Sequence, residues 1–575
     1  MKLSKTWSYN TWPHKTWFAS FGFLGLSLLA LKLIAVSHTA EVQNRTQQFH
    51  QSARTDLLHI FETSIPETVP GAIIFAVHKG EVLIESALGY ANLELEVPMQ
   101  PNQSFQIGSV AKQMTAVAIL QLIAEEKIAL QTSVADFLPD TCSIPIDITI
   151  EHLLTHTSGI PNYLAQPGWR AQARLPANAS EVHHLYCNLP THFPVGAAWD
   201  YSNSGYFLLA DIVAQVSGTS FHEYLQASVF DAADINEIWP HEPDVIYPGL
   251  VSGYIPHGAG HRPADFYDPS QILGAGSLIG TMHGLYQWYQ TMQSNVLIPQ
   301  ALRDKAWQPF YTSTGRNTEY GYGWEMKHVQ GYATVEHGGY FPGYFTSVLT
   351  VPEQDLFVAA FVNTRSYDPI DLTTRLAAAI LGQPFPEPNY VSVTDSLVEQ
   401  WQGIWVDSDG VQRRIGLRNG ELYIQRGNGS AFRLLPDNRG NLHYTDSVSY
   451  LALETSNNAQ ELVLYNRAGE QSRSERIHAE GQHYQEVELG ESQQQALSGY
   501  YQLAPEFGFR LFIDQGELYL QGTGQNAGRL MALTPLYLVS EDLIAEFEFK
   551  ADDDGNVTQM VIHQGGQRIP ALKVN

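Results

Sequence analysis

The last third of the chain contains an internal repeat, which restricts the fold of that region more than any other feature of the sequence. A run beginning Gly-Ile-Trp at 403–405 is followed by Gly-Glu-Leu-Tyr-x-Gln at 420–425, and similar runs recur at 499–501 and 516–521. The equivalent glycines, at 403 and 499 and at 420 and 516, lie 96 residues apart. A fixed offset indicates a duplicated unit. Short β patterns at hairpin spacing, without helical periodicity, predict two small antiparallel β-barrels.

The remainder of the chain is long enough to form at least one further domain. With 575 residues in total, about two to four domains are expected, because single hydrophobic cores stop growing well below this length. A proline-rich linker at 384–388 separates the repeats from the residues before them. We therefore expect a first folded domain at 41–383 and barrels at 395–482 and 490–575.

Two kinds of apolar pattern occur in the first domain. Residues 72–77 and 81–87 flank a short turn and predict a β-hairpin, and 346–351 and 356–363 predict consecutive antiparallel strands. The segment 114–123 is apolar and free of Gly and Pro, which predicts a buried helix. The domain is therefore expected to be α+β, with an antiparallel sheet flanked by helices.

The N-terminal segment has the composition of an export signal. Lys2, Lys5 and Lys15 are accompanied by no acidic residue, and a long apolar run follows at 17–36. A basic start followed by such a run is typical of a signal peptide, and this run is also long enough to span a bilayer once. We therefore expect residues 1–40 to be a signal peptide or a signal anchor. The mature protein is then periplasmic or extracellular, with 17–36 as its membrane anchor if the segment is retained.

Charge and metal-ligand spacing exclude several classes of function. The net charge is −27, so a nucleic-acid partner is not expected, because its phosphates would be repelled. His152 and His156 have a spacing that suits a metal, but no third ligand lies nearby, so packing and helix capping are favoured. The glycine-rich turns 274–276 and 320–324 lack phosphate-loop spacing and are interpreted as packing turns. We expect no metal and no cofactor.

Cys142 and Cys187 are the only cysteines. Two cysteines do not make a disulfide-dense scaffold, although an oxidising compartment would allow them to pair. Their distance in the fold decides this, and the sequence leaves it open.

A single Ser-x-x-Lys spacing occurs in the chain, at Ser109 and Lys112, just before the predicted helix 114–123. Residues three apart lie on one face of a helix, so the amine can reach the hydroxyl. A serine hydroxyl needs a neighbouring base to act as a nucleophile. A lysine can be that base only if burial or a nearby cation lowers its pKa. On its own, the spacing fits a structural serine equally well.

Two further motifs follow in order. Tyr201-Ser202-Asn203 lies in a loop just before an apolar helical run at 207–213, where side chains can point into a cleft. His337-Gly338-Gly339, followed by Tyr340, begins a predicted strand. Adjacent glycines in a strand allow another backbone or a substrate to approach closely. Taken alone, the first motif fits a plain turn, and His337 fits a core histidine.

The three motifs in this order, with Leu-Leu-Thr-His-Thr-Ser-Gly at 153–159, resemble the serine β-lactamase and penicillin-binding-protein superfamily. The resemblance extends from about residue 60 to 381 and is strongest to the class C-like branch of esterases, D-aminopeptidases and DD-peptidases. It implies a β-lactamase-like fold for the first domain. The two repeats resemble the lipocalin-like β domains that follow the catalytic unit in some D-aminopeptidase-type members.

The resemblance also implies roles for individual residues. Ser109 would attack the substrate carbonyl and form an acyl-enzyme, and Lys112 would take the serine proton. Tyr201 would act as the partner base and then as acid to the leaving group. Asn203 would hold Lys112 and the substrate amide. The backbone N–H groups of Ser109 and Tyr340 would form the oxyanion hole, and such donors usually supply a large catalytic term.

The third motif departs from the Lys-Thr-Gly of many family members. His337 and Gly339 would still belong to the substrate-binding strand, but an unperturbed histidine is largely neutral above about pH 6.5. It therefore offers no permanent positive charge to a substrate carboxylate. We expect weak recognition of a free C-terminal carboxylate and inefficient β-lactam hydrolysis.

These observations predict an exported serine hydrolase that cleaves an amide or ester in a small molecule or peptide. Peptidase or D-aminopeptidase-like activity is favoured over the alternatives of a carboxylesterase or a weak β-lactamase. A non-catalytic penicillin-binding or substrate-sensing protein is the alternative of another class. The sequence does not indicate an oligomeric state.

Overall fold

The computed structural model describes residues 54–574 apart from 66–69, 140, 259, 419, 428–430, 446, 457–458, 479–486, 505–506, 515, 524–526, 541–545, 553–554 and 565–566. The predicted signal at 1–40 lies outside the described residues. Within the described part, no helix is both long and apolar enough to cross a bilayer.

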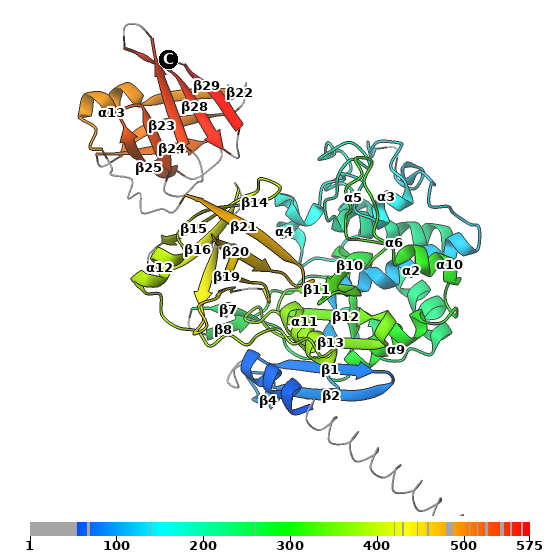
Figure 1. Cartoon of the computed structure of the whole chain (residues 1–575). Coiled ribbons are helices and arrows are strands. Elements are labelled where there is room, and N and C mark those ends of the chain that lie inside the picture. Colours follow the sequence, from blue (N-terminus) through cyan, green and yellow to red (C-terminus); the bar gives the residue numbers. More distant parts are fainter. Residues whose placement is uncertain are drawn as a thin grey trace, which may run out of the picture.

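A six-stranded antiparallel sheet forms the centre of the first domain (Figure 1). Its strands, in spatial order, are β10 (Glu325–Val329), β11 (Tyr332–Phe341), β12 (Tyr344–Val351), β13 (Leu356–Val362), β1 (Ala72–His78) and β2 (Glu81–Leu88). The hairpin β1–β2 and the consecutive strands β11–β13 confirm the predicted antiparallel sheet.

Helices cover both faces of this sheet. On β1, Ile73, Phe75 and Val77 belong to one hydrophobic core, whereas Ile74 and Ala76 belong to the other. Successive side chains of a strand point to opposite faces, so a strand buried on both faces reads as a continuous apolar run. The first core lies between the sheet and α2 (Lys112–Ala124), α6 (Asn203–Ser217) and α9 (Met282–Met292), and the second packs the helical segment 54–64 and α11 (Pro369–Ile380).

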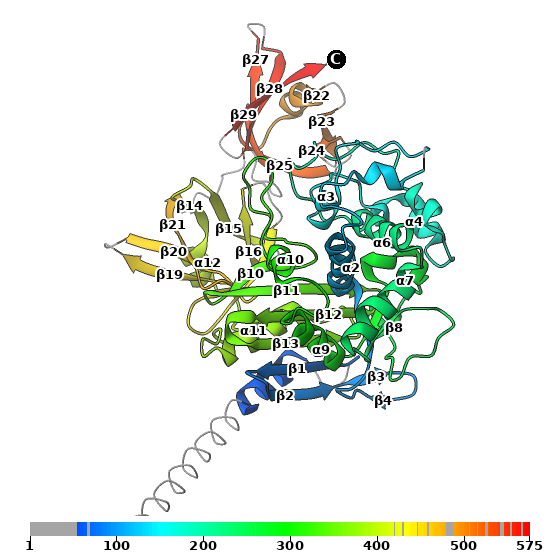
Figure 2. The same cartoon turned by 90° about the vertical axis from the view of Figure 1, so that its right-hand side faces the viewer.

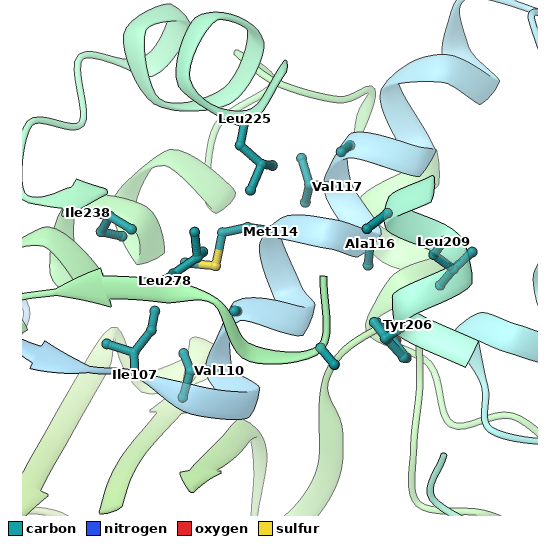
Figure 3. Close-up of a cluster of buried hydrophobic side chains, with 14 of the residues drawn as sticks. Ile107, Val110, Met114, Ala116, Val117, Tyr206, Leu209, Leu225, Ile238 and Leu278 are labelled. Atoms are coloured by element: carbon teal, nitrogen blue, oxygen red, sulfur yellow. The ribbon is translucent and has the colours of Figure 1, made fainter. Parts of the chain in front are cut away.

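Helix α2 is buried along most of its length, which holds the Ser-x-x-Lys segment in place. Met114 and Val117 of α2 pack with Leu209 of α6 and with Leu225 and Leu278 (Figure 3). All five side chains are fully or almost fully buried. Because interiors are close-packed, a helix enclosed in this way cannot shift without disturbing its neighbours.

The rest of the first domain consists of short elements. They are β3 (Tyr90–Asn92), β4 (Val97–Pro98), β5 (Phe105–Gln106), η1 (Gly108–Ala111), η2 (Val134–Phe137), α3 (Ile150–Leu154), η3 (Tyr163–Ala165), α4 (Pro167–Gln172), α5 (Ala179–His183), α7 (Phe221–Tyr224), η4 (Leu225–Phe230), η5 (Asp231–Ala233), β6 (Ile238–Pro240), β7 (Tyr254–His257), β8 (Gly260–Pro263), η6 (Pro269–Gln271), α8 (Leu273–Gly276), β9 (Leu278–Gly280), α10 (Gln300–Ala306) and η7 (Pro352–Gln354). A disulfide joins Cys142 and Cys187, which settles the pairing that the sequence left open.

Two closed eight-stranded antiparallel barrels follow, as the repeat predicted. Barrel 1 contains β14 (Gly403–Asp407), β15 (Gln412–Arg418), β16 (Glu421–Arg426), β17 (Ala431–Pro436), β18 (Leu442–Tyr444), β19 (Tyr450–Ser456), β20 (Ala459–Tyr465) and β21 (Gln471–His478). Barrel 2 contains β22 (Gly499–Ala504), β23 (Phe507–Asp514), β24 (Glu517–Gly522), β25 (Ala527–Thr534), β26 (Tyr537–Ser540), β27 (Glu546–Ala551), β28 (Val557–Gln564) and β29 (Gln567–Val574). Short helices precede them, α12 (Asp395–Trp401) and α13 (Glu491–Leu497).

Each barrel has its own apolar core. Leu422 and Leu451 contribute to the core of barrel 1, and Leu518 and Phe547 to that of barrel 2. Eight-stranded barrels are just wide enough for side chains to fill their interior. Barrel 1 lies beside the β10–β11 end of the six-stranded sheet, whereas barrel 2 lies farther from it (Figures 1 and 2).

Candidate active site

Ser109 and Lys112 lie at the junction of η1 and α2. Gly108, immediately before the serine, has a φ of +53°. A Cβ at this position would lie 2.7 Å from the backbone nitrogen of Tyr340. Glycine is therefore required here for two reasons: it tolerates the left-handed conformation, and it allows η1 to approach β11 closely. This approach brings the backbone of the serine turn beside the end of the His-Gly-Gly strand.

The Lys112 amine has three hydrogen-bond partners and, in the part of the chain that the structure describes, no counterion. Its Nζ lies 3.1 Å from Ser109 Oγ, 2.8 Å from Asn203 Oδ1 and 2.7 Å from the carbonyl oxygen of Ala275. The Lys112 side chain is fully buried, and within the described residues no carboxylate forms an ion pair with it. The structure thus brings Ser109, Lys112 and Asn203 together around one nitrogen.

This environment favours the neutral amine. Burial lowers the pKa of Lys112 well below its usual value, because desolvation disfavours the charged form. A neutral amine has two N–H groups and one lone pair. Asn203 Oδ1 and the Ala275 carbonyl are acceptors only, so they take the two N–H groups. The lone pair then faces the remaining partner, the Ser109 hydroxyl.

Tyr201 lies in the loop before α6, beside the same amine. The Lys112 Nζ lies 4.9 Å from the centre of the Tyr201 ring. Burial raises the pKa of Tyr201, and the adjacent Ser109 hydroxyl offsets this increase in part. The phenol oxygen is itself buried and has no hydrogen-bond partner of good geometry among the described residues. Tyr201 is therefore a neutral phenol next to Ser109, and its hydroxyl is available to a substrate group.

The Leu-Leu-Thr-His-Thr-Ser-Gly segment supports this loop. The Ser202 N–H donates to His156 Nδ1 at 3.1 Å, and the Ser202 hydroxyl donates to the Ile160 carbonyl at 3.0 Å. The His156 ring packs on Tyr201 with 4.3 Å between ring centres. Burial lowers the pKa of His156 well below its usual value. His156 therefore has the packing role that we expected, and the group that it packs against is the Tyr201 ring.

His337 is buried within the protein and bonded to protein groups on both ring nitrogens. Its Nε2 lies 2.9 Å from the Tyr320 hydroxyl, and its Nδ1 lies 2.6 Å from the Gly338 carbonyl oxygen. A carbonyl only accepts, so Nδ1 carries the proton and Tyr320 donates to Nε2. Burial lowers the pKa of His337 to about 4, against an opposing effect of Glu325. The imidazole is therefore neutral. Because both of its ring nitrogens are already hydrogen-bonded to protein groups, neither is free to bond a substrate directly.

Gly339 brings β11 against the serine turn. A Cβ at Gly339 would collide with the Ile107 carbonyl oxygen and the Thr346 hydroxyl, which donates to that carbonyl at 2.9 Å. Only a glycine fits where two backbones approach this closely. The next residue, Tyr340, thus has its backbone beside Gly108, while its side chain is 53% exposed at the rim of the site.

Sequence reasoning missed several members of this site. The Ala275 carbonyl comes from a turn interpreted as packing, and a backbone acceptor leaves no signal in a side-chain motif. Tyr320 comes from the other glycine-rich turn, and its hydroxyl fixes His337. The described residues contain no group of three or more His, Cys, Asp or Glu side chains arranged to hold a metal ion.

Comparison with known proteins places the chain in a family. The family model for Beta-lactamase matches residues 61–383, more than half of the chain. Penicillin-binding protein 4* of Bacillus subtilis strain 168 is 25% identical over 402 residues, which cover 65% of this chain and 88% of the relative. The D-aminopeptidase of Gluconobacter oxydans strain 621H is 26% identical over 319 residues, which cover 55% of this chain and 60% of that protein.

Solved structures agree with this placement at the level of the fold. An octameric penicillin-binding protein homologue from Pyrococcus abyssi aligns with a TM-score of 0.53 and 20% identity, covering 74% of this chain and 99% of that one. The resemblance inferred from the three ordered motifs is thereby confirmed. The chain belongs to the Beta-lactamase family and is a serine hydrolase related to penicillin-binding proteins and D-aminopeptidases.

Proposed function

We propose that the protein hydrolyses an amide or ester bond through an acyl-enzyme on Ser109, with D-aminopeptidase-like activity as the favoured reaction. The observation that carries this proposal is the geometry at Lys112 Nζ. Two acceptor-only oxygens, from Asn203 and Ala275, leave the amine lone pair for the Ser109 hydroxyl at 3.1 Å. A buried neutral amine held in this way is a general base.

In the acylation step, Ser109 Oγ forms a bond to the substrate carbonyl carbon as its proton moves to Lys112 Nζ. The negative charge that develops on the carbonyl oxygen would be accepted by the backbone N–H groups of Ser109 and Tyr340. The close approach of Gly108 to Tyr340 supports this assignment. One such donor is worth roughly 3–4 kcal/mol of transition-state stabilisation.

Collapse of the tetrahedral intermediate breaks the bond from carbon to the leaving group, and the leaving nitrogen or oxygen takes a proton. Tyr201 is suited to deliver it, because its neutral hydroxyl is buried beside Ser109. Lys112, which holds the serine proton at this stage, lies 4.9 Å from the centre of the Tyr201 ring and is the nearby group that can restore the Tyr201 proton. Water then attacks the acyl-enzyme in the reverse sequence of proton transfers and frees Ser109.

The neutral state of His337 favours substrates without a free carboxylate next to the scissile bond. A lysine at this position would add a permanent charge, whereas His337 is buried and its pKa is about 4. Amides and anilides of D-amino acids fit this requirement, and the relative from Gluconobacter oxydans is named a D-aminopeptidase. Carboxylesterase or weak β-lactamase activity is the second candidate, supported by the same acyl-enzyme geometry.

We also propose that the protein acts outside the cytoplasm, in the periplasm or the medium. The basic and apolar composition of residues 1–36 supports this location. The Cys142–Cys187 disulfide supports it independently, because disulfides persist mainly in oxidising compartments.

The decisive experiment maps the nucleophile and the substrate together. Purified protein is incubated with a fluorophosphonate probe, and its turnover of D- and L-aminoacyl anilides, acyl esters and nitrocefin is measured. We expect Ser109→Ala to lose labelling and to reduce turnover by at least about 10³-fold. Ser313→Ala, at an exposed serine, is the matched control and should behave as wild type. Labelling of Ser109→Ala at the wild-type rate would disprove the assignment.

A further inference from the structure

The tip of the β20–β21 hairpin of barrel 1 is hydrogen-bonded to the turn between β10 and β11 of the first domain. The Gln330 N–H donates to the Arg467 carbonyl at 3.1 Å, and the Gly331 N–H donates to the Ala468 carbonyl at 2.6 Å. Gln330 and Gly331 form the turn between β10 and β11. A Cβ at Gly469 would lie 2.9 Å from the Gln330 side chain. The two turns are therefore in close backbone contact, at the side of the sheet where Figures 1 and 2 show barrel 1.

The Arg467 side chain joins three segments at this contact. Its two terminal nitrogens donate to both oxygens of Glu336, at 2.8 and 2.6 Å, and its Nε donates to the Thr374 hydroxyl at 3.1 Å. Glu336 lies on β11 and is 5% exposed. The second cation near Glu336 is Lys327, whose Nζ lies 3.8 Å from Glu336 Oε1 and is also paired with Glu325. A bidentate pair of this kind fixes orientation as well as charge.

Glu336 is the residue immediately before His337. The titratable groups that face His337 are Glu325 and Lys327 from β10 and Lys112 from the serine turn, and the Tyr320 hydroxyl donates to its ring. Burial raises the pKa of Glu325, but its surroundings, including the cations Lys327 and Arg467, outweigh this effect and lower the pKa. Arg467 therefore acts electrostatically on Glu325, and Glu325 is the carboxylate that raises the pKa of His337.

We propose that barrel 1 is a positioning element of the active site, and that Arg467 holds Glu336 and so fixes the part of β11 that carries His337 and Tyr340. The proposal rests on the function proposed above, because Tyr340 matters here as the oxyanion donor. Arg467 touches neither substrate nor nucleophile, so it is a positioning residue.

Loss of Arg467 has two consequences in this arrangement. Glu336 becomes a buried carboxylate that competes with Glu325 for Lys327, and breaking one side of a buried pair is strongly destabilising locally. The shift of β11 moves the Tyr340 N–H, which acts in the transition state, so kcat falls more than KM rises. Negative charge left near His337 favours its protonation, so the acid limb of the kcat/KM profile moves to higher pH.

The test compares Arg467→Ala with Arg473→Ala on the best anilide or ester of the panel. Arg473 lies on the same hairpin, in β21, and pairs with Glu454 at 2.8 Å and Glu461 at 2.9 Å, all within barrel 1. We expect Arg467→Ala to reduce kcat by about ten- to a hundredfold, the range for a misplaced catalytic group, and to move the acid limb. Arg473→Ala should retain the wild-type kcat and pH profile.

Two further variants keep the test decisive if Arg467→Ala folds poorly. Arg467→Lys keeps one charge but not the bidentate geometry, so an intermediate kcat is expected. Glu336→Gln removes the charge that needs Arg467, so adding it to Arg467→Ala should recover part of the lost kcat. If Arg467→Ala and Arg473→Ala show the same kcat, KM and pH profile, the proposal is overturned. Normal turnover by Ser109→Ala would instead overturn the proposed function, which separates the two failures.

Discussion

The two barrels are copies of one plan. In barrel 1, the indole Nε1 of Trp405 donates to the Trp401 carbonyl at 3.1 Å, and in barrel 2 the Tyr501 hydroxyl donates to the Leu497 carbonyl at 2.5 Å. Both pairs follow the 96-residue offset (405 and 501, 401 and 497), and both rings are fully buried. At the same position in each repeat, an aromatic side chain thus hydrogen-bonds the last turn of the short helix that precedes its barrel.

The copies differ in polar groups near their cores. Barrel 1 has an ion pair between Asp407 and Arg413 at 2.8 Å, where barrel 2 has Leu503 and Phe509. Barrel 1 also has a fully buried carboxylate, Asp437, where the offset gives a leucine in barrel 2. Buried ion pairs are not a general source of stability. Their presence in only one copy therefore points to a role other than stabilising the barrel.

That role is visible where barrel 1 meets the rest of the chain. Asp437 orders a turn whose Asn438 N–H donates to the Asn389 carbonyl and whose Arg439 donates to the Glu387 carbonyl, both between α11 and barrel 1. The β20–β21 turn, which carries Arg467, has five residues between its strands, whereas two residues separate β28 from β29 in barrel 2. The two barrels therefore share their shape, and in barrel 1 the Asp437 turn and the β20–β21 turn contact the rest of the chain.

The largest expected effect comes from removing the ring that closes each barrel. Trp405→Ala should destabilise barrel 1 by about 3–5 kcal/mol, the usual cost of such a buried truncation, and Tyr501→Ala should destabilise barrel 2 comparably. Only Trp405→Ala should reduce turnover, because among the described residues it is barrel 1 that contacts β11, through Arg467. Hydrogen exchange measured on peptides from each barrel, together with turnover of the best substrate, checks this. A fall in turnover with Tyr501→Ala and none with Trp405→Ala would refute the comparison.

Acid should affect barrel 1 through Asp437. Burial alone would raise the pKa of this carboxyl, but hydrogen bonds from His443, Asn441 and Arg439 outweigh it and lower the pKa to about 2. The unfolded value is about 3.9, so the stabilisation is complete above about pH 4 and is lost as pH falls through 2. Asp437→Asn should cost about 1.5–3 kcal/mol at neutral pH and should remove this acid dependence.

The measurement for Asp437 is hydrogen exchange in barrel 1 peptides between pH 6 and pH 2.5, corrected for intrinsic exchange rates. Asp514→Asn, at an exposed carboxylate of barrel 2, is the control and should follow wild type. If Asp437→Asn keeps the full acid dependence of wild type, another carboxylate causes it.

Much of the fold was predictable because its signals are local. Hairpin spacing and the 96-residue repeat are visible in the sequence itself, and they predicted the β1–β2 hairpin, the consecutive strands β11–β13 and both barrels. The pairing of β1 with β13, which joins these parts into one six-stranded sheet, was not predicted. The pairing of Ser109 with Lys112 was predictable for the same reason, since three residues on a helical turn share a face. The placement of Tyr201 beside Lys112 could be expected only from the family resemblance, because 89 residues separate them.

The rest of the site depends on contacts that leave no sequence pattern. The Ala275 carbonyl is a backbone group, and Glu336 and Arg467 are 131 residues apart and belong to different domains. Burial also changes the meaning of His337. As a residue type it suggests a group that titrates near neutrality, but its surroundings keep it neutral and bonded to Tyr320.

The smallest expected effect is the sharpest test of the comparison between the copies. Replacing Asp407 and Arg413 together by the residues of barrel 2, in Asp407→Leu/Arg413→Phe, should change the stability of barrel 1 by less than about 1.5 kcal/mol, because a matched apolar pair can replace an ion pair. Either single substitution should cost about 3–5 kcal/mol, since it leaves one charge buried without its partner. Urea unfolding followed by hydrogen exchange in barrel 1 measures all three variants. Because Arg467 and Glu336 are untouched, the double variant should keep its turnover. The comparison fails if the double variant loses stability by the sum of the two single losses, or if it loses turnover while its stability is retained. Either result would show that the ion pair has a function that the apolar pair of barrel 2 cannot replace.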